Sequence, residues 1–389
     1  MELTLLFLLL PVAAVSGWWI GSRQQAAEKS PVGGDFSSDY FKGLNYLLGE
    51  QPDKAIDVFV KMLEVDSETV ETHLALGNLF RRRGEVDRAI RIHQNLMARP
   101  VLSREQRAFA LFELGRDYLH AGMLGRAESL FLELLAQGSH RGEALARLLD
   151  IYQQEKSWDK AIDAAQRLEN VSGRRMDDLV AQFYCELAEK SLEAGDERAA
   201  QRHIQQALAT DRKCARASLL KADMEKAAGN YKEAIKALRQ VEQQEPAYLP
   251  EAVPALAECY NLLGTSAEGE EYLRHLLQQY GGISPLLSLA ELVRQRQGEG
   301  AAAELIVNSL RQRPSVRGLD RLIELDLVAS EGAARENLLV LKELTKRLMD
   351  ERSAYRCRNC GFKAKVLHWQ CPSCRRWSSI RPVQGVVGE

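Results

Sequence analysis

The stretch LGNLFRRRGEVDRAI, residues 76–90, sets the fold that we expect for this chain. Its Leu-Gly pair is followed by an aromatic residue, then by a turn at Gly84, and five positions after the turn by a small residue, Ala89. The apolar positions on each side of the turn share one face at helical spacing. The stretch LGRDYLHAGMLGRAESLF, residues 114–131, repeats this order around Gly122. Two amphipathic helices joined by a short turn are therefore the expected structural unit.

The same unit recurs between residues 38 and 350, with neighbouring turns 34, 38, 34, 39, 34, 35, 34 and 34 residues apart. The turn residues are Glu50, Gly84, Gly122, Lys156, Gly195, Gly229, Gly264, Gly298 and Gly332. The small residues five positions later are Ala55, Ala89, Ala127, Ala161, Ala200, Ala234, Gly269 and Ala303. A period of this length predicts a solenoid at residues 38–350, in which each helix pair packs on its neighbours.

The order of Leu-Gly, Tyr, Ala and Phe resembles the tetratricopeptide repeat. An aromatic residue stands four positions before several turns, as Tyr46, Phe80, Tyr118, Tyr152 and Tyr260. The resemblance implies an all-α superhelical solenoid of about nine helix pairs, whose concave face binds segments of partner proteins. We interpret the aromatic positions as core packing and assign no partner-binding residue from the sequence.

Charge and motifs argue against a general nucleic-acid binder and against an enzyme. The 389 residues carry 52 Lys and Arg against 54 Asp and Glu, so no net charge steers the chain toward an anionic partner. No phosphate-binding loop, H-E-x-x-H or G-x-S-x-G motif occurs. A G-x-G-x-x-A match at residues 298–303 coincides with a repeat turn and follows no expected strand. We therefore expect no catalytic residues and no enzymatic activity.

Residues 3–20, LTLLFLLLPVAAVSGWWI, contain no charge and would span about 27 Å as a helix, near the roughly 30 Å of a bilayer core. The two tryptophans suit the headgroup level, and basic residues follow them. The alternative, a cleaved signal peptide, lacks a basic segment before the apolar run. We expect a transmembrane anchor at 1–20, a flexible tether at 21–37, and the bulk of a single-pass protein in the cytoplasm. A periplasmic solenoid would need the opposite topology.

Four cysteines near the end of the chain follow the order C-x2-C, ten residues, C-x2-C. They are Cys357, Cys360, Cys371 and Cys374. Two such knuckles direct four thiolates at one tetrahedral ion, so we expect one iron or zinc ion per chain. The knuckles resemble rubredoxin-type domains, although Arg375 replaces the usual glycine after the second. The other three cysteines stand alone in helical segments, which favours a reducing compartment over a disulfide framework. These are Cys185, Cys214 and Cys259.

Residues 351–389 are expected to form a small metal-binding domain in which the ion is structural, since about forty residues need such a staple. A redox-active pair would need a βαβ context that the sequence lacks. Only the short segment MDERSA precedes Tyr355, so we expect the domain to pack against the last helix pairs. Basic residues around the knuckles, with Trp369 and Trp377, leave open a nucleic-acid-binding or general scaffold protein.

The apolar stretch LLFLLLPVAA, the repeat GNLFRRRGEVDRAIRIHQ and the terminal CRNCGF and CPSCRRW knuckles resemble the lipopolysaccharide assembly protein B family along the whole chain. The resemblance implies an adaptor of the inner membrane that regulates lipopolysaccharide synthesis. Its implied partners are a membrane-bound AAA+ protease, the deacetylase that commits sugar nucleotide to lipid A, and lipopolysaccharide assembly proteins. The adaptor is expected to promote degradation of the deacetylase by the protease.

Overall fold

The structure is a computed structural model that describes residues 38–389 except 50, 66–69 and 101. The expected transmembrane anchor and tether, residues 1–20 and 21–37, lie outside the described residues. Within the described ranges, no helix has the length and apolar character needed to cross a membrane. The chain divides into two compact units at residue 140, and the structure describes the first from residue 38 onward and the second as Arg141–Glu389.

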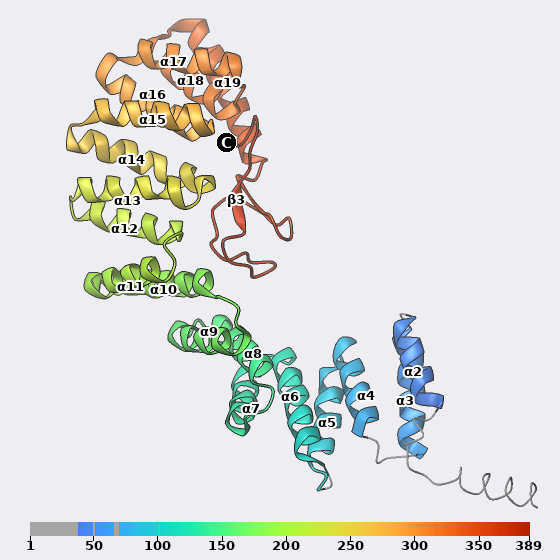
Figure 1. Cartoon of the computed structure of the whole chain (residues 1–389). Helices are drawn as coiled ribbons and strands as arrows, with labels where there is room; N and C mark the ends of the chain where they lie inside the picture. Colours follow the sequence, from blue (N-terminus) through green and yellow to red (C-terminus); the bar gives the residue numbers. More distant parts are fainter. Residues whose placement is uncertain (1–37, 50, 66–69, 101) are drawn as a thin grey trace, which may run out of the picture. The chain divides into compact units, whose positions relative to one another are not determined.

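The described part of the first unit is built from successive helix pairs (Figure 1). These are α2 (Ser38–Leu48) with α3 (Pro52–Val65), α4 (Val70–Arg82) with α5 (Val86–Met97), and α6 (Arg104–His120) with α7 (Leu124–Gln137).

The second unit continues the same pairing and adds a 3-10 turn, η1 (Pro246–Tyr248), before its fourth pair. The pairs are α8 (Arg141–Gln154) with α9 (Trp158–Ser172), α10 (Asp177–Glu193) with α11 (Glu197–Thr210), α12 (Ala215–Ala227) with α13 (Tyr231–Gln244), α14 (Leu249–Leu263) with α15 (Ser266–Tyr280), α16 (Ile283–Gln297) with α17 (Glu299–Gln312), and α18 (Val316–Ala329) with α19 (Gly332–Asp350). The prediction of an all-α repeat of helix pairs is confirmed for the described part of residues 38–350.

The predicted turns are where the backbone reverses. Every predicted turn residue in the described part has a positive φ, a conformation in which glycine meets no Cβ penalty. Lys156 adopts it as well, with a φ of 54°. The small residues that follow are fully buried between helices, as shown by the 0% exposure of Ala55, Ala89, Ala127, Ala161, Ala200 and Ala234.

One predicted position is wrong by a residue. In the α16–α17 pair the buried small residue is Ala302, which is 1% exposed, and Ala303 is only partly buried. The cause is a shorter turn, because α17 begins directly after Gly298, whereas α5 begins two residues after Gly84. The helix therefore turns its apolar face toward the core one position earlier.

Small residues are required where the paired helices approach most closely. A Cβ on Gly115 in α6 would lie 2.8 Å from a ring carbon of Phe131 in α7. Gly269 replaces the expected alanine in α15 for the same reason, since a Cβ there would lie 2.8 Å from the ring of Tyr260. The aromatic residue of one helix thus fills the space that the missing side chain leaves on its partner.

Replacing Ala127 by leucine is expected to lower the free energy of unfolding by about 1–3 kcal/mol, because the added carbons overpack a helix crossing. Chemical denaturation followed by far-UV circular dichroism measures this change. The matched control is Ala136→Leu on the exposed face of the same helix, where a change within about 0.5 kcal/mol is expected. Equal effects at the two positions would show that the assigned helix register is wrong.

A buried charged network joins α4, α5 and α6 in the first unit. Arg81 Nη2 lies 2.6 Å from Glu113 Oε2, and Arg81 Nη1 lies 2.7 Å from Asp117 Oδ1. His93 Nδ1 is 2.5 Å from the other oxygen of Asp117. At most 5% of each of these four side chains is exposed. Charges buried this far are stable only when they are paired, so the network links two successive repeats.

The residues after α19 form a small three-stranded antiparallel sheet. It consists of β1 (Tyr355–Cys357), β2 (Lys363–Ala364) and β3 (Ile380–Pro382), in the order β2-β1-β3. Tyr355 pairs with Ala364 on one side and with Pro382 on the other. The two loops that this sheet holds together carry the four clustered cysteines. We call residues 355–382 the metal unit.

Candidate metal centre and its seat on the helices

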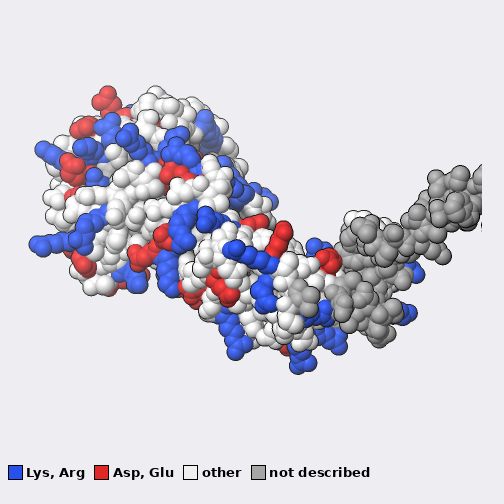
Figure 2. Space-filling view, turned by 60° about the horizontal axis from the view of Figure 1, so that its bottom comes forward, with Lys and Arg blue, Asp and Glu red and all other residues white. Residues whose placement is uncertain are grey.

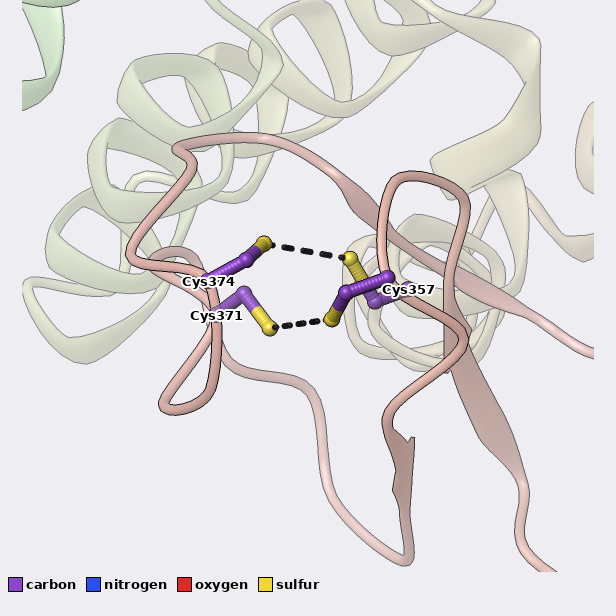
Figure 3. A group of neighbouring side chains, drawn as sticks. Cys357, Cys371 and Cys374 are labelled. Carbon is purple, nitrogen blue, oxygen red and sulfur yellow. Dashed lines mark hydrogen bonds between the residues drawn. The ribbon is translucent and has the colours of Figure 1, made fainter. Parts of the chain in front are cut away.

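The four cysteine sulfurs of the metal unit converge on one point. All four Sγ atoms lie within 4.8 Å of one another. Cys357 Sγ is 3.7 Å from Cys374 Sγ, and Cys360 Sγ is 3.7 Å from Cys371 Sγ (Figure 3). A tetrahedron with metal–sulfur bonds of about 2.3 Å has edges of about 3.8 Å. The sulfurs therefore already have the spacing of a tetrahedral site for one iron or zinc ion, as predicted.

The two knuckles have matching backbones. The N–H of Gly361 donates to the carbonyl of Cys357 at 3.0 Å, and the N–H of Arg375 donates to the carbonyl of Cys371 at 2.8 Å. Both turn residues have a positive φ, 79° for Gly361 and 56° for Arg375. A left-handed conformation costs a residue with a Cβ about 1–2 kcal/mol. The departure from glycine at Arg375 is thus accommodated without a change of knuckle geometry.

Hydrogen bonds around Cys357 favour the thiolate that a metal needs. Burial acts to raise the pKa of this thiol, but hydrogen bonds with Ser379 Oγ and with the backbone N–H groups of Cys360 and Asn359 outweigh it and lower the pKa to about 6. Cys371 differs, because burial raises its pKa to about 11. The metal unit thus contains one thiol, in the first knuckle, that ionises readily and one, in the second knuckle, that does so only when a cation compensates its charge.

The metal unit packs against helices of the second unit that are distant from it in the sequence (Figure 1). The indole N–H of Trp377 donates to Gln153 Oε1 at 2.9 Å, at the end of α8. Its ring meets those of Trp158 and Phe183 edge-on, with centroids 6.0 and 5.8 Å away. We expected this domain to pack against the last helix pairs, but the contacts of Trp377 lie far earlier in the sequence, on α8, α9 and α10.

Arg216 on α12 lies beneath both tryptophans of the metal unit. Its guanidinium carbon is 5.7 Å from the ring centroid of Trp369 and 5.9 Å from that of Trp377. Only 2% of its side chain is exposed, and it pairs with Glu186 and Glu189 at 2.8 Å each. Because these carboxylates neutralise the cation, Arg216 can be buried under the rings.

Further along, the metal unit contacts the segment between α13 and α14. Arg381 lies 4.1 Å from the ring centroid of Tyr248 and pairs with Glu245 at 2.8 Å. The hydroxyl of Tyr248 donates to the carbonyl of Ile380 at 3.2 Å, and burial raises the pKa of this tyrosine to about 12. Tyr355 donates to Glu251 on α14 at 2.5 Å. Buried polar contacts of this kind fix the orientation of the metal unit on the helices.

The tail after the metal unit is also tied to the helices. Ser284, at the start of α16, donates its hydroxyl to Glu389 Oε1 at 2.6 Å and its backbone N–H to Oε2 at 3.1 Å. Arg317 on α18 pairs with the same carboxylate. The last pairs thus hold the tail, while the cysteine knuckles lie over α8 to α14.

These contacts give the aromatic residues of the metal unit a different role from nucleic-acid stacking. Trp369 lies against Tyr248, with ring centroids 4.8 Å apart and planes tilted by 54°, and Trp377 packs on α8 to α10. Both half-buried rings thus contact side chains of the helices. On the face shown in Figure 2, Lys and Arg side chains are interspersed with Asp and Glu. The arrangement therefore favours protein packing as the role of these residues.

Replacing Trp377 by alanine is expected to loosen the metal unit from the helices, with a loss of about 2–3 kcal/mol from the aromatic contacts and the hydrogen bond to Gln153. Hydrogen–deuterium exchange should rise both in the metal unit and around α8 to α10, while metal content stays at one ion per chain. The control is Val366→Ala, since Val366 is 61% exposed in the same unit. Loss of the metal in the Trp377 variant would contradict the view that Trp377 only docks the metal unit on the helices and that the cysteines alone hold the ion.

Comparison with protein-family models agrees with this architecture. A family model described as "Rubredoxin metal binding domain" matches residues 355–382, and tetratricopeptide repeat models match residues 72–108 and 185–250. Among solved structures, the C-terminal part of a TPR repeat-containing protein from Cytophaga hutchinsonii aligns over 62% of this chain and 95% of its own. Its sequence identity is 12% and its TM-score is 0.42.

Two curated relatives match along essentially their whole length. Lipopolysaccharide assembly protein B of Escherichia coli (strain K12) is 42% identical over 99% of this chain and 100% of its own length. Its namesake from Haemophilus influenzae is 38% identical over 97% of this chain and 98% of its own. Identity at this level, over nearly the whole length of both chains, shows that the chain belongs to the lipopolysaccharide assembly protein B family.

Proposed function

We propose that this chain is an adaptor in lipopolysaccharide assembly that acts by holding other proteins and performs no catalytic step. The observation that carries the proposal is the match to lipopolysaccharide assembly protein B along essentially the whole of both chains. Tandem helix pairs support it, because such repeats present extended surfaces for protein segments.

We further propose the partners and the place of action. The adaptor is anchored in the inner membrane by residues 1–20, with its bulk on the cytoplasmic side. There it brings the deacetylase that commits sugar nucleotide to lipid A to a membrane-bound AAA+ protease, and it gathers lipopolysaccharide assembly proteins. Delivery of a substrate to a protease requires only that both be bound at once, which raises their effective concentration.

The metal unit covers part of the helix surface of the second unit and so restricts where a partner can bind. The faces of α8, α10, α12 and α14 that contact Trp377, Trp369 and Tyr355 are covered. A partner of this unit must therefore contact the remaining helix surface together with exposed parts of the metal unit, such as Lys363 and Arg376. In this arrangement the metal unit is part of the binding surface, and its fold matters for function.

The test is a crosslinked purification of the full chain from membranes, followed by mass spectrometry of the captured proteins. The AAA+ protease and the deacetylase are expected among them. In parallel, the half-life of the deacetylase should lengthen when the chain is depleted and return when it is restored. An unchanged half-life of the deacetylase after depletion of this chain would overturn the proposed role in proteolysis.

Deleting residues 1–22 is expected to leave the helix pairs and the metal unit folded, because these residues precede the first described helix, α2. Function should fall, since the adaptor would no longer be confined near membrane-bound partners. Membrane fractionation and deacetylase half-life, at native expression level, are the measurements. Fusing an unrelated single-span anchor to the truncated chain is the control, and it should restore function. Full activity of the free truncated chain would argue against anchoring.

A further inference from the structure

Two cysteines that stand far apart in the sequence are in contact in the second unit. Cys185 lies in α10 and Cys214 is the residue just before α12, and their Sγ atoms are 3.8 Å apart. The exposed fractions are 0% for Cys185 and 2% for Cys214. Cys259, the other cysteine outside the metal unit, belongs to a different core cluster in α14. The pair therefore joins two successive repeats through sulfur.

The surroundings give the two thiols different pKa values. Cys214 sits at the N-terminus of α12, where it receives a hydrogen bond from the backbone N–H of Ala217. Gln182 Nε2 also donates to it at 3.5 Å. The two sulfurs share a hydrogen bond for which either can be the donor. With Cys185 as the donor, this bond lowers the pKa of Cys214, and the same bond, together with burial, raises the pKa of Cys185. Cys214 is thus suited to be the thiolate and Cys185 to be the thiol of the pair.

One cysteine of the pair borders a cavity. Cys214 lines a cavity of about 540 Å³ between α8, α10, the start of α12 and the metal unit, beside Arg216 and Trp377. Exposed side chains such as Arg174 and Lys213 also line it, so the cavity opens to solvent. Cys185 lies behind Cys214 and takes no part in the lining. An oxidant entering the cavity would meet Cys214 first.

We propose that Cys185 and Cys214 form a dithiol–disulfide modification site whose oxidant is hydrogen peroxide. The Cys214 thiolate attacks one peroxide oxygen, the O–O bond breaks, hydroxide leaves, and Cys214 becomes a sulfenic acid. The Cys185 sulfur then attacks the sulfenic sulfur, the S–S bond forms, and the hydroxyl leaves as water with the Cys185 proton. Two electrons pass from the thiols to peroxide, and exchange with a small thiol restores the pair.

The step needs little movement. The sulfurs must approach from 3.8 Å to about 2.05 Å, which side-chain rotation and small helix shifts can supply. The bond would join α10 to α12, the two helices whose Phe183 and Arg216 contact Trp377 of the metal unit. Oxidation would then stiffen the part of the second unit on which the metal unit rests.

The test uses the full metal-loaded chain, treated with a small excess of hydrogen peroxide, blocked with N-ethylmaleimide and digested without reductant. Mass spectrometry is expected to find the 185–214 linked peptide, with its loss after dithiothreitol and with Cys259 still alkylated. Oxidation should also raise the melting temperature, and the Cys185→Ala and Cys214→Ala variants should lose both changes. A Cys259→Ala control should keep them. Metal content is followed in the same samples.

Two outcomes would overturn the proposal. One is oxidation confined to the four metal ligands, with no 185–214 link at any peroxide dose. The other is a link that forms only after the metal has left, because the pair would then be closed to oxidant in the folded protein. A 185–214 linked peptide at full metal occupancy supports the proposed disulfide site. A rise in melting temperature that persists in the Cys259→Ala control shows that the effect does not come from oxidation of Cys259.

Discussion

Changing Cys357 and Cys371 to serine together is expected to abolish stoichiometric metal binding and to unfold residues 355–382. One ligand is removed from each knuckle, and the metal unit has only two- and three-residue strands to hold it without the ion. Structural metal binding supplies on the order of 10 kcal/mol to such small units, which is nearly all of their folding free energy. This is the largest effect that we expect from any substitution in the chain.

Metal analysis of the purified protein gives the first measurement, with about one iron or zinc ion per chain in the parent and none in the double variant. Helical circular dichroism should change little, whereas the melting temperature of the second unit should fall, because Trp158 and Phe183 lose the ring of Trp377. Cys259→Ser is the matched control, since it changes a cysteine outside the knuckles. Unchanged metal content in the double variant would refute the ligand assignment.

Replacing Arg81 by methionine is expected to destabilise the first unit by about 3–5 kcal/mol, because the buried carboxylates of Glu113 and Asp117 would lose the cation that bridges them. Methionine keeps most of the side-chain volume, so the effect reports on charge rather than on a cavity. Urea denaturation followed by circular dichroism, on the full chain, resolves this change as an earlier transition. Metal content, which belongs to the other unit, should be unaffected.

The control for this prediction is Arg88→Met, which removes an arginine paired with Glu85 in the same unit. Arg88 is 66% exposed, so its pair contributes about 0–1 kcal/mol. If both variants lost the same small amount, the buried network would contribute no more than an ordinary surface pair. A loss at Arg81 several times larger than at Arg88 supports its role in joining the repeats.

The correct predictions were those that depend on neighbours along the chain. Gly84 and Gly122 mark turns because a positive φ is a local backbone property that glycine favours. Cys357 and Cys360 face the same point because a C-x2-C turn brings its own two thiols together. The error at Ala303 was also local, since nothing in the period of 34 residues indicated that the turn before α17 is shorter by one residue.

The other errors and the omissions concern contacts between residues distant in the sequence. Amphipathic helices usually expose their charged residues, so the sequence did not indicate that Arg81, Glu113 and Asp117 are buried together. Cys185 and Cys214 looked like isolated residues because they belong to different repeats. A charged residue at a position that faces the neighbouring repeat is the one signal that could have suggested the buried network.

The repeat period and the cysteine spacing were thus enough to establish the helix pairs and the four metal ligands, because both follow from short-range backbone geometry. Where the metal unit packs on the helices could be learned only from the folded structure. Trp377 meets Gln153 across 224 residues of sequence, and that contact exists because the intervening pairs stack and bring α8 to α14 alongside the knuckles. Shape and polar complementarity over such distances arise from the summed packing of many repeats, which no local pattern encodes.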